Sequence, residues 1–213
     1  NLPRIELREL TSIKETRPAA VLTGNRAWQS VGSLLELPTV VQAEPYTARR
    51  DVLDDLAENL PEQVQVVYGV GGGLVCDVAK YVAWKNGIPS VIIPTALSVD
   101  GFFTSLVAVR ADNSVYYETT GPAEKVIIDI EVVANAPKNI RGTGIVEILS
   151  MTTGLLDWKY AADMKKNSYV ERYQPWAAKI AAGIAQQAYK IARGVGEGRP
   201  DALRNLLDLI CVE

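Results

Sequence analysis

The feature that most constrains the fold is an alternation of short β-branched segments with longer segments of helical period. The predicted strands cover residues 19–23, 39–42, 64–68, 91–93 and 126–130, and the helices between them cover residues 26–35, 47–60 and 74–85. The segments VQVVY at 64–68 and VII at 91–93 are apolar at almost every position, as strands covered on both faces must be. This order predicts a parallel sheet with helices on its two faces.

Two parts of the chain depart from this order. Residues 106–117 alternate around Ala111-Asp112-Asn113, which predicts a β-hairpin. From residue 134 onward the pattern is helical, and we expect helices at 144–164, 170–193 and 201–212, with a break at 194–200. The prediction is an α/β fold: a parallel, Rossmann-like N-terminal domain with a β-hairpin insertion (residues 1–133), followed by the start of an all-helical domain (residues 134–213) that we expect to be incomplete.

Composition narrows the range of partners. With 22 Lys and Arg against 25 Asp and Glu, the net charge is −3 and there is no basic run, so we do not expect a nucleic acid partner. No segment approaches the apolar length of a membrane span. Cys76 and Cys211 form no CxxC pair and lie far apart, which is typical of free thiols in a cytoplasmic protein. The sequence has no histidine, so the commonest metal ligand and the usual base at neutral pH are both missing.

The sharpest local signal is a glycine cluster between a buried strand and an amphipathic helix, GVGGG at 69–73. Glycines let the backbone approach an anion closely, and the N–H groups of a helix N-terminus favour its charge. The cluster therefore predicts a phosphate or pyrophosphate site. Its spacing matches only part of the dinucleotide fingerprint, so a tight turn without a ligand is the alternative.

Polar residues also follow the fourth predicted strand, in the segment PTALSVDG at 94–101. Loops at the carboxyl edge of a parallel sheet commonly bind ligands. Thr95 and Ser98 can donate to phosphate or ribose oxygens, and Asp100 can accept from a substrate hydroxyl. The alternative is a loop whose Ser or Asp caps the next segment.

A third candidate is Glu147, in the segment GIVEILS that opens the first long helix. Its carboxylate can bind a metal, or it can compensate the helix dipole.

In this order, the three segments resemble the glycerol-1-phosphate dehydrogenase-like branch of the superfamily that contains glycerol dehydrogenases, iron-containing alcohol dehydrogenases and dehydroquinate synthases. The resemblance is strongest over residues 64–162, through GVGGGLVCDVAKYVAWKNGIPSVIIPTALSVDGFFT and VIIDIEVVANAPKNIRGTGIVEILSMTTGLLDWKYA. It implies that the pyrophosphate of NAD or NADP is cradled by Gly71, Gly72 and Gly73 with Asp77 and Lys80. It also implies that Thr95 and Ser98 reach the cofactor, that Asn25 meets the adenosine ribose, and that Asp100 lies near the substrate and a metal.

The metal ligands depart from the family pattern. The first family ligand is an aspartate preceded by glycine, and the matching pair here is Val146-Glu147, which makes Glu147 the candidate ligand for zinc or iron. The other two family ligands are histidines on later helices, and this sequence has none. Either the sequence is part of a longer chain, in keeping with its start at Asn1-Leu2-Pro3-Arg4 without an initiator Met, or the metal site has been lost.

The resemblance implies an NAD(P)-dependent and metal-dependent oxidoreductase that transfers hydride between the cofactor and a small polyol or glycerol phosphate. One alternative is a phosphate-eliminating lyase like dehydroquinate synthase, although FFTSL at 102–106 replaces the glycine-lysine segment of that group. The other is a nucleotide-binding module without catalysis. Neither Thr23-Gly24-Asn25 nor Gln42-Ala43-Glu44 decides between NAD and NADP. A homo-oligomer remains an open option.

Overall fold

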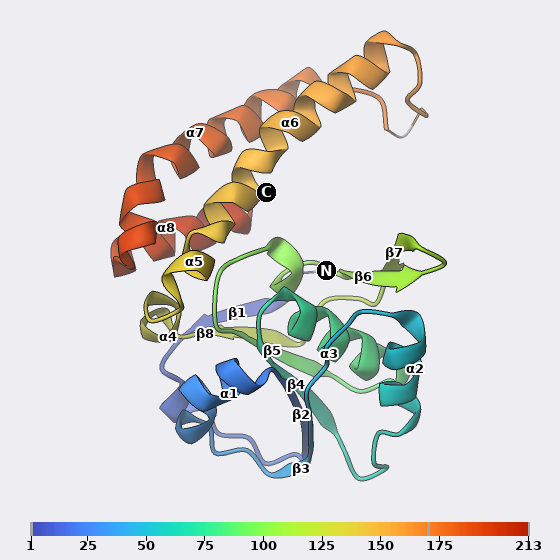
Figure 1. Ribbon diagram of the computed structural model, residues 1–213, viewed down its shortest axis with the longest axis vertical. Coiled ribbons are helices and arrows are strands. Elements are labelled where there is room, and N and C mark those ends of the chain that lie inside the picture. Colours follow the sequence, from blue (N-terminus) through green and yellow to red (C-terminus); the bar gives the residue numbers. More distant parts are fainter. Residues whose placement is uncertain (1, 170, 213) are drawn as a thin grey trace.

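The computed structural model describes residues 2–169 and 171–212. At its centre lies a six-stranded parallel sheet in the order β1-β8-β5-β4-β2-β3 (Figure 1). The strands are β1 (Arg4–Leu7), β2 (Ala19–Thr23), β3 (Thr39–Ala43), β4 (Val66–Gly71), β5 (Ser90–Pro94) and β8 (Lys125–Ile128). The predicted parallel α/β architecture is confirmed. The edge strand β1 was not predicted, because its RIEL sequence carries only a short and weak alternation.

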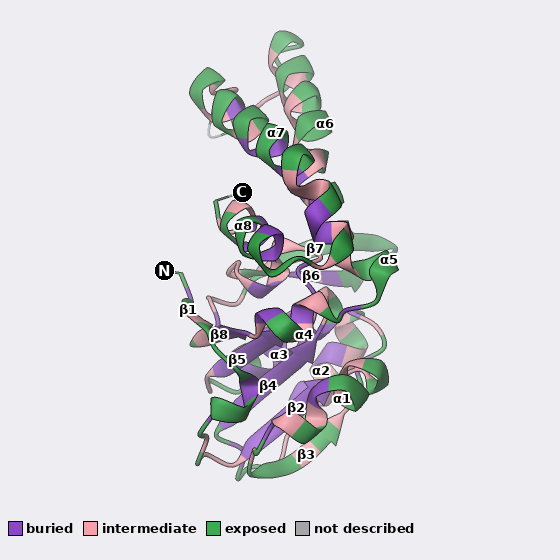
Figure 2. Cartoon of the chain, turned by 90° about the vertical axis from the view of Figure 1, so that its left-hand side faces the viewer, coloured by how far each residue is buried: buried purple, intermediate pink, exposed green. Residues whose placement is uncertain are grey.

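Helices cover both faces of the sheet. They are α1 (Asn25–Val31), α2 (Arg50–Glu58) and α3 (Gly73–Lys85). In β5, Ile92 packs into the core shared with α2 and α3, whereas Val91 and Ile93 pack into the core on the α1 side. In Figure 2 the central strands are coloured as buried. Burial on two faces is the physical reason for the continuous apolar runs of these strands.

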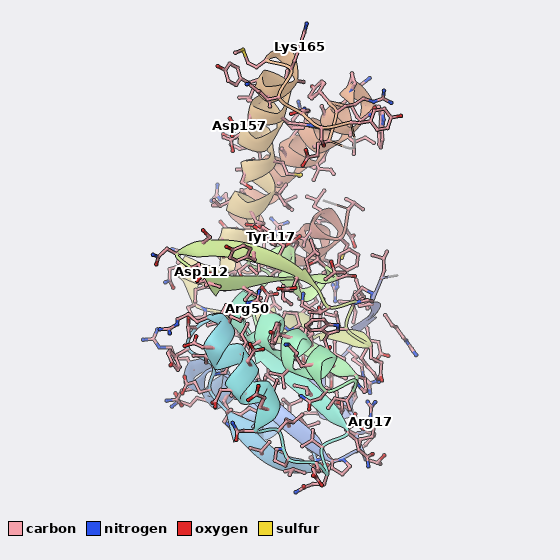
Figure 3. All side chains as sticks on the ribbon, turned by 90° about the vertical axis from the view of Figure 1, so that its right-hand side faces the viewer. Arg17, Arg50, Asp112, Tyr117, Asp157 and Lys165 are labelled. Carbon is pink, nitrogen blue, oxygen red and sulfur yellow. The ribbon has the colours of Figure 1, made fainter. Side chains whose placement is uncertain are left out.

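The predicted hairpin is also confirmed. Its antiparallel strands are β6 (Leu106–Ala111) and β7 (Ser114–Thr119). Asp112 and Asn113 form the two-residue turn with φ of 50° and 57°, which is the left-handed backbone that a tight hairpin turn requires. The hairpin lies beside α2, where Arg50 forms an ion pair with Glu118; Figure 3 labels Arg50 below the hairpin residues Asp112 and Tyr117.

The rest of the chain is helical. It contains α4 (Ile130–Ala134), α5 (Lys138–Arg141), α6 (Thr143–Asp163), α7 (Pro175–Glu197) and α8 (Pro200–Ile210). The two long helices α6 and α7 run side by side away from the sheet, and α8 returns to pack against α4 (Figure 1). The far parts of α6 and α7 are mostly exposed (Figure 2). None of the helices in the described ranges has the length and apolar character needed to cross a membrane.

The predicted break before the last helix is present but shorter than 194–200, since it covers only Gly198 and Arg199. Helix α7 continues through Gly194 to Glu197 and ends at Gly198, whose φ of 76° is the left-handed conformation of a helix C-terminus. A Cβ on Gly194 would lie 2.8 Å from the Cβ of Ala202, so this glycine allows α7 and α8 to pack closely. The predicted helix 170–193 begins later, at Pro175, and residue 170 lies outside the described residues.

Candidate cofactor and substrate site

The glycine cluster lies where β4 passes into α3. Strand β4 runs through Gly71, Gly72 is the N-cap of α3, and Gly73 is its first residue. A Cβ on Gly72 would have no heavy atom within 4 Å, so the space in front of this residue is open. Within the described part of the chain, no side chain caps α3. The first N–H groups of this 13-residue helix are therefore available to an anion placed at Gly72.

Two other glycines of the cluster have a packing role. A Cβ on Gly69 would lie 2.6 Å from the Cβ of Ala79, so Gly69 allows α3 to lie close against β4. A Cβ on Gly73 would lie 2.6 Å from Cγ2 of Val99, which brings the loop after β5 against the start of α3. Of the glycine cluster, Gly72 is therefore the residue that faces open space, since Gly69 and Gly71 belong to the strand and Gly73 packs against Val99.

A cavity of about 880 Å³ lies over the carboxyl ends of β2, β4 and β5. It is within the range of small-molecule sites. Of the residues singled out from the sequence, it is lined by Asn25, Gly71, Gly72 and Thr95, and the N–H of Thr95 donates to the Gly71 carbonyl at 3.1 Å. The remaining candidates are not among its lining residues: Gly73, Asp77, Ser98, Asp100 and Glu147.

Asp77 and Lys80, which the resemblance associates with the pyrophosphate, are engaged inside the protein. The Lys80 side chain is only 1% exposed, and its Nζ donates to the carbonyls of Thr104 and Leu106 at 3.0 and 2.6 Å. The same Nζ lies 3.3 Å from Oδ1 of Asp77. The second carboxylate oxygen of Asp77, Oδ2, accepts the N–H of Ala108 at 3.1 Å. Burial raises the pKa of Asp77, and the positive charge of Lys80 opposes this rise. The pair therefore connects α3 to the segment that leads into the hairpin.

Asp100 and Glu147 come from separate elements. Asp100 begins the short helix η3 (Asp100–Phe102), and Glu147 lies in the second turn of α6. Burial raises the pKa of Glu147, and the negative charge of Asp100 raises it further, so Glu147 lies within electrostatic reach of Asp100. Gly144 allows α6 to lie against the loop that leads to Asp100, because a Cβ on Gly144 would overlap the carbonyl oxygen of Leu97. Ser98, in the same loop, is half-buried.

Sequence reasoning missed the role of three residues near these sites. Glu44 lines the cavity, and its Oε1 accepts the N–H of Asn25 at 2.8 Å. Asp129 also lines it; its carboxylate accepts the N–H of Leu10 at 3.0 Å and caps α4. Gly144 holds α6 against the loop after β5. An acidic residue after a strand was a usable signal for Glu44 and Asp129, whereas nothing in the sequence pattern marks the contact made by Gly144.

Solved structures share this architecture, a Rossmann-like parallel α/β unit joined to helices. A probable glycerol dehydrogenase from Sinorhizobium meliloti matches 98% of this chain and 63% of its own, with a TM-score of 0.75 at 19% identity. Glycerol dehydrogenase from Schizosaccharomyces pombe matches 98% of this chain and 59% of its own, with a TM-score of 0.70 at 24% identity. At these identities the likeness establishes the fold.

The family follows from the sequence itself. The profile of iron-containing alcohol dehydrogenases matches residues 6–137, and the chain belongs to this family. Its relatives include the glycerol-1-phosphate dehydrogenase (NAD(P)+) of Hyperthermus butylicus, 32% identical over 199 residues, and that of Methanothermobacter thermautotrophicus, 32% identical over 195 residues. These alignments cover 89% and 87% of this chain but 55% and 54% of the relatives, so the chain spans about half of their length. The expected family resemblance is confirmed.

Proposed function

We propose that the cavity over β2, β4 and β5 binds NAD or NADP, with the pyrophosphate at Gly72, between the end of β4 at Gly71 and the start of α3. The observation that carries this proposal is the open space at Gly72, directly in front of an uncapped helix N-terminus. An anion there gains backbone hydrogen bonds and a favourable helix dipole. Asn25 on one side and Thr95 on the other line the same cavity, so both can contact the groups that flank the pyrophosphate.

In this proposal the complete protein is an oxidoreductase that acts on a small polyol or its phosphate. The names of the relatives support this substrate class. The cofactor, when bound, supplies or accepts a hydride. Asp100 accepts a hydrogen bond from the reacting hydroxyl and so orients the carbon that carries it. Ser98, in the same loop, does not line the cavity, so in this proposal any contact between Ser98 and the cofactor lies beyond the cavity. Because both cysteines of the chain are free thiols, we include a cytoplasmic location in the proposal.

The family implies a divalent metal, and the residues present supply only part of a site for one. Asp100 and Glu147 supply two carboxylates, but among the described residues no group of three His, Cys, Asp or Glu side chains gathers. Zinc sites take three or four protein ligands. These residues by themselves do not fit a complete site, so we assign no step to a metal. Glu147 is the residue that would contribute to zinc or iron if further ligands were supplied from elsewhere.

Two alternatives to an oxidoreductase are a phosphate-eliminating lyase and a nucleotide-binding module without catalysis. Phe102 is 2% exposed and belongs to the hydrophobic core, whereas residues 103–105 are half-buried and Leu106 is exposed. An apolar side chain is therefore buried in the segment where a lyase of this superfamily would bind its anionic substrate. This favours the oxidoreductase over the lyase. The other alternative is the nucleotide-binding module. A steady-state assay of the complete protein with zinc, using glycerol 1-phosphate, dihydroxyacetone phosphate and glycerol with each cofactor, distinguishes the enzyme from the module.

The cofactor site is tested by Gly72→Val. The valine side chain would fill the space assigned to the pyrophosphate, so we expect NADH affinity in calorimetry to fall by more than about tenfold, with an unchanged circular dichroism spectrum. Gly154→Val is the control, because a Cβ at Gly154 in α6 also has no heavy atom within 4 Å. Unchanged NADH affinity in Gly72→Val would refute the assignment.

A further inference from the structure

The strand order and the position of Asp100 set the direction in which the dinucleotide lies across the sheet in this proposal. In the sheet, β4 lies between β5 on one side and β2 on the other, with β3 beyond β2. The candidate substrate residue Asp100 follows β5, so the nicotinamide half belongs on that side. The adenosine half then extends over the carboxyl ends of β2 and β3, where Asn25 and Glu44 line the cavity. A dinucleotide that spans the sheet edge in this way places its adenosine ribose next to Glu44.

The Glu44 carboxylate is held in place by the β2–α1 turn. Its Oε1 accepts the N–H of Asn25 at 2.8 Å, and a Cβ on Gly24 would lie 4.0 Å from the same oxygen. This hydrogen bond uses one of the two oxygens, which leaves acceptor positions for a ligand hydroxyl. Because the N–H of Asn25 already has an anionic partner, an incoming phosphate would have to displace Glu44 to reach it.

We infer that Glu44 makes the site selective for NAD over NADP, an inference that rests on the cofactor function proposed above. The ribose 2′-hydroxyl of NAD can donate a hydrogen bond to the carboxylate, whereas the 2′-phosphate of NADP brings negative charge against it. Arg26 lines the same cavity and is the feature that favours a phosphate. Arg26 is exposed and makes no ion pair within the described part of the chain. Glu44 is anchored at the turn itself and therefore dominates at the 2′ position.

The test is Glu44→Gln. Glutamine keeps the size of the side chain and an oxygen that can accept the N–H of Asn25, but it removes the charge. Dissociation constants of NADH and NADPH are measured by fluorescence titration at low ionic strength. We expect the unmodified chain to bind NADH about tenfold more tightly than NADPH, and we expect Glu44→Gln to strengthen NADPH binding about fivefold while NADH affinity changes less than about threefold.

Two further variants check the origin of the effect. Glu36→Gln is the matched control, because Glu36 is exposed and is not among the residues that line the cavity, and it should leave both affinities unchanged. Adding Arg26→Gln to Glu44→Gln should take away most of the gain in NADPH affinity.

The outcomes separate this inference from the proposed function. If the unmodified chain binds neither nucleotide, the cofactor site itself is wrong. If it binds nucleotide and Gly72→Val abolishes binding, but Glu44→Gln leaves the NADH to NADPH ratio unchanged, the cofactor site stands and the role of Glu44 is refuted. An equal loss of both affinities in Glu44→Gln would also refute selectivity, because it would mean that Glu44 only supports the turn.

Discussion

Replacement of Lys80 by methionine tests whether the Asp77–Lys80 pair stabilises the fold or holds the cofactor. Methionine is similar in length and apolar, so Lys80→Met mainly removes the ammonium group. It leaves the Thr104 and Leu106 carbonyls without their donor and Asp77 without its cation. Breaking a buried ion pair at one partner costs about 3–5 kcal/mol. The Asp77 side chain retains 18% exposure and can be partly hydrated, so we expect the lower end, about 3 kcal/mol.

The free energy of unfolding is measured by urea titration of the 213-residue chain. Lys85→Met is the control on the same helix, because Lys85 pairs with Asp54 at 3.2 Å with side-chain exposures of 40% and 34%, and it should cost no more than about 1 kcal/mol. The cost of Lys80→Met should fall as the pH is lowered, since burial already raises the pKa of Asp77 and protonation removes its unpaired charge. A stability loss under about 1 kcal/mol combined with loss of NADH binding would refute this reasoning and assign Lys80 to the cofactor.

Three further predictions concern the contributions of Glu15 and Gly144 to stability and the role of Glu147. Arg17 lowers the pKa of Glu15 from 4.5 to about 2, which stabilises the fold by up to about 3 kcal/mol. This stabilisation should be complete above pH 4.5 and be lost as the pH falls toward 2. Glu15→Gln should therefore flatten the acid side of the curve of unfolding free energy against pH, and an unchanged curve would contradict the assignment. Gly144→Ala should destabilise the chain by about 1–3 kcal/mol in urea titrations, because the new Cβ would overlap the Leu97 carbonyl; a neutral effect would mean that α6 moves away freely. Glu147→Gln in the complete protein should abolish zinc-dependent turnover if Glu147 is a metal ligand, whereas a role in dipole compensation predicts intact activity and a stability change of no more than about 1 kcal/mol.

The fold was predictable to a large extent because its signals are local. Strands buried on both faces are continuously apolar, and the hairpin turn at Asp112 and Asn113 needs residues that accept a left-handed backbone. The errors occurred where tertiary packing decides. Gly194 looks like a helix breaker in the sequence, yet it lies within α7 because its missing Cβ leaves room for Ala202 of α8. The edge strand β1 was missed because pairing with β8, more than 100 residues away, stabilises a segment with little signal of its own.

By itself, the sequence determined the parallel α/β class, the family and the glycine turn, since periodicity and glycine spacing are properties of neighbouring residues. The tertiary structure alone decided which side chains share a site. It separated Gly72, which opens on the cavity, from Gly69 and Gly73, which serve close packing, and it turned Lys80 inward to backbone carbonyls. It also brought Glu44 to Asn25 across two strand ends. These outcomes depend on contacts between distant segments, which are set by how the helices pack on the sheet and leave no periodic trace in the chain.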